Sequence, residues 1–149
     1  MGNSLDISFS FSWDSIRKRD DNEYLYPNAV NLLDPEHNIP AIYKWSVFKP
    51  DIEDSKIVYI GETEKLINRI RGYLNPGPTQ QTNKRINKFF NEYLDKGYRI
   101  SLHTLSFNEI KLNNIIIKYN DIFDHDIRKA LEQLFIVIYK KEEYTLLNR

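Results

Sequence analysis

The sequence predicts a small α+β domain in which a three-stranded, mostly antiparallel sheet is flanked by helices. Segments with strand and helix patterns follow one another in the order β-β-α-α-β-α, after an additional strand near the N-terminus. The chain has 149 residues, of which 41% are hydrophobic, and this is enough for one domain with a sizeable core. Its 21 basic and 21 acidic residues balance, which at first argues against a polyanionic partner.

We expect residues 1–40 to form an N-terminal extension that packs on a main domain at residues 41–149. Apolar residues near the start alternate with serines, with the period of a half-buried strand. Prolines and Asn or Asp residues near the end of the extension predict a loop. The alternating apolar residues are Ile7, Phe9, Phe11 and Trp13.

The main domain is predicted to begin with a β-hairpin and a helix. Residues 41–48 and 56–61 are rich in β-branched and aromatic residues and are joined by a short polar connection. From Thr63 the apolar period changes to that of an amphipathic helix over residues 63–74, with Thr63 as its N-cap. Two prolines and a glycine at 75–78 end this helix.

The rest of the chain is predicted to add two helices and one strand. A second helix runs from 82 to 96 and ends before Gly97. Residues 98–107 alternate as a third strand of the sheet. Residues 108–123 fit either a short edge strand or an insertion, and the last helix covers 124–141.

Several common functional devices are absent from the sequence. It has no Gly-rich phosphate loop and no Gly-x-Ser-x-Gly motif, so we expect no nucleotide cofactor. With no cysteine there is no disulfide, thiolate zinc site or thiol catalysis. No apolar run is long enough to span a bilayer and no secretory signal is visible, so we expect an intracellular, cytoplasmic protein without a membrane partner.

Two segments contain residues suited to phosphodiester chemistry. Arg69 and Tyr73 are four residues apart and project from one face of the first helix, where an arginine fork can bind phosphate oxygens. Glu132 lies among apolar residues of the last helix, and carboxylates are rarely buried without a partner. The structural alternative for Glu132 is an ion pair with Arg128, one turn earlier. A lone carboxylate also suits Mg²⁺, which keeps several waters.

These residues occur within a longer pattern that resembles the GIY-YIG nuclease family. The chain reads Ala-Ile-Tyr at 41–43 and Tyr-Ile-Gly at 59–61 on the two predicted hairpin strands. Arg69 and Tyr73 follow at the family's spacing, Glu132 matches its glutamate in an apolar helix, and Asn148 matches its asparagine near the chain end. The resemblance covers roughly residues 41–148, which is most of the chain, and implies the GIY-YIG nuclease fold.

The resemblance also implies roles for the matched residues. Tyr43 would activate a water molecule, and Tyr59 would position that water or share its proton. Arg69, with Tyr73 as its helper, would stabilise charge on the scissile phosphate. Glu132 would bind a single Mg²⁺, for which Mn²⁺ could substitute.

Two further residues would support this site, and one departs from the family pattern. A side chain at Gly61 would obstruct the substrate backbone, and Asn148 would hydrogen-bond near the site without reacting. Glu62 occupies a position at which many family members have lysine or glutamine. We therefore expect the positive charge to come from elsewhere, such as Lys65.

A local basic segment gives the expected DNA contact despite the neutral total charge. Between Glu64 and Lys88 there are six basic residues and one acidic residue. The structural alternative is that those on the second helix form a solvated charged face. Besides Arg69, the basic residues are Lys65, Arg71, Lys84, Arg85 and Lys88.

The sequence thus predicts a metal-dependent endonuclease that hydrolyses DNA phosphodiester bonds, of a restriction or structure-selective type. The alternative is a catalytically inactive nucleic-acid-binding or interaction module with the same fold. RNA is the less favoured substrate. Cutting of both strands would favour a homodimer, because it needs two active sites.

Overall fold

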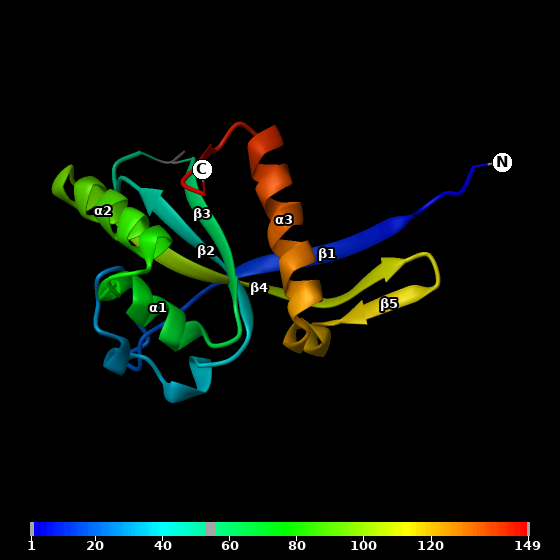
Figure 1. The fold of residues 1–149 in the computed structure, drawn as a ribbon, viewed down its shortest axis with the longest axis horizontal. Coiled ribbons are helices and arrows are strands. Elements are labelled where there is room, and N and C mark those ends of the chain that lie inside the picture. The colour runs from blue at the N-terminus through cyan, green and yellow to red at the C-terminus, as the bar shows by residue number, and fades with distance from the viewer. Residues whose placement is uncertain (1, 53–55, 149) are drawn as a thin grey trace.

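A computed structural model describes residues 2–52 and 56–148. Within them, α1 and α2 pack on one face of a mixed β-sheet and α3 packs on the other (Figure 1). The strands are β1 (Ile7–Ser15), β2 (Ala41–Phe48), β3 (Ile57–Thr63), β4 (Arg99–Leu112), β5 (Ile115–Lys118) and β6 (Thr145–Leu146). The helices are α1 (Leu66–Leu74), α2 (Gln81–Asp95) and α3 (His125–Lys141), with 3-10 turns η1 (Val30–Leu32), η2 (Pro35–His37) and η3 (Tyr119–Phe123).

The α+β class is confirmed, but the three-stranded sheet was wrong, because the described residues form a six-stranded sheet. Its order is β1-β4-β2-β3-β6, with β5 also paired to β4. The long strand β4 accounts for most of the difference. Its first half pairs with β2, and its continuation pairs with β1 and then also with β5, all antiparallel. Only the short pairing of β3 with β6 is parallel.

The predicted hairpin is confirmed, and the ends of the neighbouring elements are corrected. β2 and β3 pair antiparallel from Ala41 and Thr63 to Val47 and Ile57. Because β3 continues through Thr63, α1 starts only at Leu66, and Thr63 is not its N-cap. The Thr63 hydroxyl instead accepts a hydrogen bond from the backbone N–H of Lys65 and forms a tight turn before the helix.

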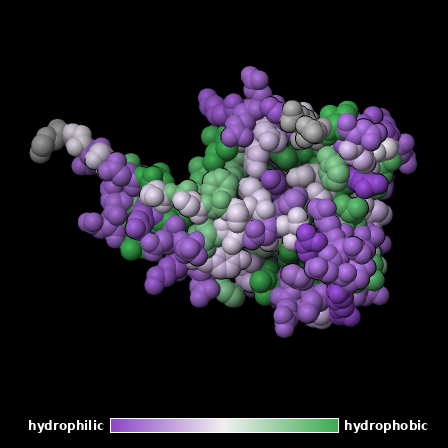
Figure 2. Space-filling model, turned by 180° about the vertical axis from the view of Figure 1, so that it is seen from behind, coloured by the Kyte–Doolittle hydropathy of each residue, from purple (hydrophilic) through white to green (hydrophobic). Residues whose placement is uncertain are grey.

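The ambiguous segment after residue 107 continues the sheet. β4 runs on to Leu112, the chain turns at Asn113 with a positive φ of 54°, and β5 returns along β4. Together with β1, these strands form an arm that projects from the body of the molecule (Figure 1 and Figure 2). Phe9, Phe11 and Trp13 of β1 pack near Phe135 of α3, with ring centroids 4.9–6.0 Å apart.

Two hydrophobic layers hold the helices on the sheet. Successive residues of a strand point to opposite faces, so Tyr43 and Trp45 face α1 and α2 whereas Ile42 faces α3. Residues 1–40 take part in both the sheet and the core, since they supply β1 and the buried Tyr24 and Tyr26. Within the described ranges, no helix is both long and apolar enough to cross a membrane.

Candidate active site

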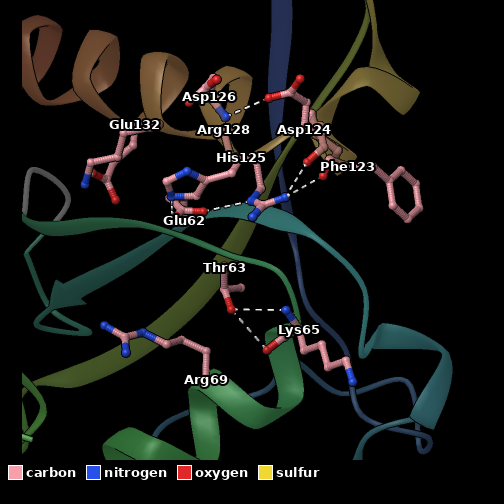
Figure 3. Close-up of polar contacts among 12 residues, drawn as sticks. Glu62, Thr63, Lys65, Arg69, Phe123, Asp124, His125, Asp126, Arg128 and Glu132 are labelled. Carbon is pink, nitrogen blue, oxygen red and sulfur yellow. Dashed lines mark hydrogen bonds and ion pairs between the residues drawn. The ribbon is translucent and has the colours of Figure 1, made fainter.

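The candidate site is a pocket at the edge of β3, between α1 and α3. β6 pairs only with Ile57 and Val58, so the strand beyond them is not covered by β6. The pocket over this part of β3 has a volume of about 630 Å³. Figure 3 shows Arg69 of α1 and Glu132 of α3 on opposite sides of β3, with Glu62 and Thr63 between them.

Four of the residues predicted from the sequence meet in this pocket. Tyr59, Arg69, Glu132 and Asn148 all line it, although they come from β3, α1, α3 and the C-terminal segment. Asn148 is held by the backbone of Ile60, whose N–H donates to Oδ1 over 3.0 Å and whose carbonyl accepts from Nδ2 over 2.6 Å. Its side chain thus continues the hydrogen bonding of the sheet edge where β6 ends.

Tyr43 and Tyr73 lie behind Arg69 in the protein core. Their hydroxyls share a hydrogen bond of 2.6 Å, and the Arg69 Nε donates to the Tyr43 hydroxyl over 3.0 Å. The Arg69 guanidinium also lies over the Tyr73 ring, 4.8 Å from its centroid. Tyr43 and Tyr73 are 1% and 0% exposed and do not line the pocket. Their contacts hold Arg69, which does line it.

The environment of Tyr43 opposes ionisation of its hydroxyl. Burial raises the pKa of Tyr43, and the neighbouring Arg69 charge offsets only part of this effect. Burial likewise raises the pKa of Tyr73 well above its ordinary value. Activating a water molecule requires an ionised tyrosine, so the raised pKa of Tyr43 disfavours that role. Tyr59 is the tyrosine that lines the pocket.

The packing of Tyr43 requires a glycine at position 61. The sequence analysis expected this glycine to make room for the substrate backbone. The two residues are directly opposite in the β2–β3 hairpin. A Cβ at Gly61 would overlap the Cζ and hydroxyl of Tyr43 and come within 2.8 Å of its Cε2. The missing side chain therefore makes room for the tyrosine ring, rather than for a substrate backbone.

Glu132 is almost buried, with 8% of its surface exposed, and is paired within α3. Its Oε1 accepts hydrogen bonds from Lys129 Nζ over 2.7 Å and from Gln133 Nε2 over 3.1 Å. The pKa of Lys129 is raised by this hydrogen bond to Glu132. The alternative of an ion pair with Arg128 is wrong, because Arg128 turns toward β3 instead.

Arg128, which is buried, forms an ion pair with the half-buried Glu62 that the sequence analysis missed. Arg128 Nε lies 2.8 Å from Glu62 Oε2, and its Nη1 donates to the carbonyls of Ile122 and Phe123 (Figure 3). His125 Nε2 lies 3.4 Å from the other Glu62 oxygen. No local pattern signals this pair, because Arg128 and Glu62 are 66 residues apart in the sequence.

The positive charge in the pocket comes from Arg69, Arg128 and Lys129 and not from Lys65. Arg128 and Lys129 line the pocket from α3. Figure 3 shows the Lys65 side chain extending away from Arg69 and Glu132. The expectation that Lys65 compensates for Glu62 was therefore wrong, because the turn before α1 directs that side chain elsewhere.

The other basic residues of the predicted DNA contact lie on α1 and α2. Arg71, Lys84 and Lys88 are exposed, although Arg71 also donates to Asn68 and Lys84 to the Pro78 carbonyl. Arg85 is only half-exposed, and its Nη1 donates to the Leu147 carbonyl over 2.8 Å. Arg85 thereby anchors the segment that presents Asn148, which is a structural role.

The donors around Glu132 are chemically suited to Mg²⁺. Carboxylate, hydroxyl and amide oxygens line the pocket, and Mg²⁺ prefers such ligands with several waters retained. Over residues 2–52 and 56–148 there is no group of three or more His, Asp or Glu side chains that could hold a metal ion. A single-carboxylate site at Glu132 fits these residues, provided that Lys129 releases the carboxylate.

Compared with models of protein families, with curated proteins and with solved structures, the chain matches none. The relation to the GIY-YIG nucleases stays a prediction, which depends on the motif residues and their placement.

Proposed function

We propose that this protein is a metal-dependent endonuclease that hydrolyses DNA phosphodiester bonds, with a GIY-YIG nuclease fold built around β2, β3 and α1. The main support is the meeting of Arg69 and Glu132 in one pocket, together with Tyr59 and Asn148. These residues come from β3, α1, α3 and the C-terminal segment. A cation that can bind phosphate and a carboxylate that can bind a metal ion then share one solvent-accessible site.

Arg69 binds the scissile phosphate in this proposal. Its Nε is fixed by Tyr43 and its plane lies over Tyr73, so the guanidinium loses little freedom when it binds an anion. Preorganised donors of this kind stabilise developing charge more effectively than donors that must reorient. Tyr43 and Tyr73 therefore act through the position of Arg69.

Glu132 holds the Mg²⁺ or Mn²⁺ ion, and Tyr59 contacts the attacking water. The ion supplies charge neutralisation and a more acidic bound water when it is present. Tyr59 is better placed than Tyr43 for this contact, because Tyr59 lines the pocket whereas Tyr43 is buried with a raised pKa.

DNA extends from the pocket along α1 and α2 in this proposal. The exposed Arg71, Lys84 and Lys88 contact backbone phosphates there, whereas Arg85 supports the fold. The cleavage is of a restriction or structure-selective type, and a homodimer would be needed to cut both strands in one encounter.

The alternative is a nucleic-acid-binding or interaction module of the same fold without activity. The ion pairs in the pocket favour it, because Lys129 neutralises Glu132 and Arg128 neutralises Glu62. A phenol with a raised pKa at Tyr43 is also a poor base. Cleavage and binding must therefore be measured separately.

Supercoiled plasmid incubated with the full chain and Mg²⁺ or Mn²⁺ tests the proposal. We expect nicked or linear product, with a loss of at least about 100-fold in Glu132→Gln and in Arg69→Ala, because each removes a charge from the reacting centre. Glu142→Gln and Arg99→Ala are matched controls on exposed surface outside the pocket and should cleave like the wild type.

Binding without cleavage would support the module instead. That result requires a wild-type chain that shifts DNA in a gel yet cleaves neither DNA nor RNA with either metal ion. Cleavage confined to RNA would retain the nuclease chemistry and change the substrate class.

A further inference from the structure

Lys129 is an exposed cation at the wall of the candidate pocket. Its side chain is 53% exposed, whereas that of its partner Glu132 is 11% exposed. The ion pair joins residues three apart on α3, with Nζ 2.7 Å from Oε1. A half-exposed lysine retains much side-chain freedom, which weakens the ion pair that it makes. Lys129 can therefore leave Glu132 without disturbing α3.

The other charges in the pocket leave few places for a released Lys129. Glu62 is already paired with Arg128 and contacted by His125. Glu64 is the remaining carboxylate that lines the pocket, and it is exposed to solvent. Arg69 lies on the opposite side of β3 from α3 (Figure 3). Because Arg69 and Lys129 line the same pocket, a phosphate bound at Arg69 would have a second cation on the α3 wall of that pocket.

We propose that Lys129 exchanges Glu132 for a substrate phosphate: it pairs with Glu132 in the free protein and contacts the DNA backbone once that carboxylate is used for metal binding. This inference rests on the proposed nuclease function. It adds a substrate-binding residue from α3 that no motif in the sequence indicated.

The physical basis is competition for one carboxylate oxygen. A divalent cation bound to Glu132 would repel the ammonium group that lies 2.7 Å from its Oε1, so metal binding weakens this contact. The displaced ammonium has three N–H donors and suits a phosphate as a point charge. Lys129 therefore lowers metal affinity in the absence of DNA and raises DNA affinity in the presence of metal.

Mn²⁺ binding to the full chain without DNA tests the first half. The free Mn²⁺ signal in electron paramagnetic resonance gives the dissociation constant for the wild type and for Lys129→Met, which keeps the length and helix preference of the side chain. We expect Lys129→Met to bind Mn²⁺ about threefold more tightly or better. Lys129→Arg keeps the charge and should match the wild type, as should Lys141→Met on the exposed end of α3.

The salt dependence of DNA binding with Ca²⁺ tests the second half. Loss of one phosphate contact should reduce the slope of log K against log salt by about 0.9 in Lys129→Met. A tighter Mn²⁺ affinity together with this smaller slope supports the exchange. A merely structural defect would instead weaken the binding of Mn²⁺ as well as that of DNA.

Either unchanged quantity overturns the inference. An unchanged Mn²⁺ affinity in Lys129→Met means that Lys129 does not compete for Glu132. An unchanged slope means that the released Lys129 moves to Glu64 or into solvent and not to a phosphate. Neither measurement needs cleavage, so failure of the nuclease proposal is detected separately, by the plasmid assay.

Discussion

At the scale of single residues, the close approach of Gly61 and Tyr43 sets the geometry of the candidate site. The tyrosine ring occupies the space that a Cβ at Gly61 would need. This placement brings the Tyr43 hydroxyl to both Tyr73 and Arg69. One missing side chain thereby permits the hydrogen bonds that orient Arg69.

Gly61→Ala should destabilise the fold by about 1–3 kcal/mol, because the new methyl group overpacks a buried ring. Urea denaturation followed by circular dichroism measures this loss. Gly2→Ala, where a Cβ meets nothing within 4 Å, should leave the stability unchanged. Combining Gly61→Ala with Tyr43→Leu should reduce the cost of the alanine. Equal costs in both backgrounds would contradict the assigned clash.

At the scale of elements, α3 is tied to β3 by the Arg128–Glu62 ion pair. Arg128 is 4% exposed and also satisfies two carbonyls at the end of η3. The same residue therefore joins the strand, the 3-10 turn and the helix that presents Glu132. Breaking a buried pair by removing one partner leaves an uncompensated charge, which is strongly destabilising.

Arg128→Met should lower the free energy of unfolding by about 3 kcal/mol, since it leaves Glu62 and two carbonyls without their donor. Denaturant unfolding measures the loss, with Arg99→Met on the exposed start of β4 as the control. The double variant with Glu62→Gln should lose less than the sum of the single variants. Additive losses would show that the pair does not couple the two elements.

At the scale of the whole molecule, β4 organises the sheet, and half-buried ionisable groups lie close to it. His103 of β4 contacts the Ser101 hydroxyl, and Lys44 of β2 donates to the Tyr139 hydroxyl across the α3 interface. Burial lowers the pKa of Lys44 to about 8. Burial, followed by the Lys44 charge, lowers the pKa of His103 to about 4, while Asp14 acts in the opposite direction.

Protonation of His103 should make the fold less stable in acid. Between pH 6.5 and 4 the unfolded chain binds more protons at this residue than the folded chain, so stability falls as pH falls through this window. Because His103 is partly exposed, we expect a contribution of only about 1 kcal/mol. Thermal and urea unfolding at pH 7 and pH 5 measure it. The stability of His103→Gln should depend less on pH than that of the wild type, whereas His37→Gln should behave like the wild type.

Much of the fold was predictable from local patterns. The β2–β3 hairpin, the three helices and the alternation in β1 were all indicated by local features. These features are the period of the apolar residues and the Gly, Pro or Asp residues near the ends of the elements. The size of the sheet was not predictable. Strand pairing is a contact between distant segments, and the pattern of residues 108–112 did not show that they would continue β4 between β1 and β5.

Four of the residues expected from the sequence line one pocket, but their hydrogen-bond and ion-pair partners were not predictable. The sequence by itself determined that Arg69 and Glu132 lie on the first and last helices. The tertiary structure decided that Tyr43 is buried behind Arg69, that Arg128 pairs with Glu62, and that Lys129 pairs with Glu132. Helical spacing allowed Glu132 to pair with either Arg128 or Lys129. Only the packing of α3 against β3 placed the carboxylate of Glu62 beside Arg128.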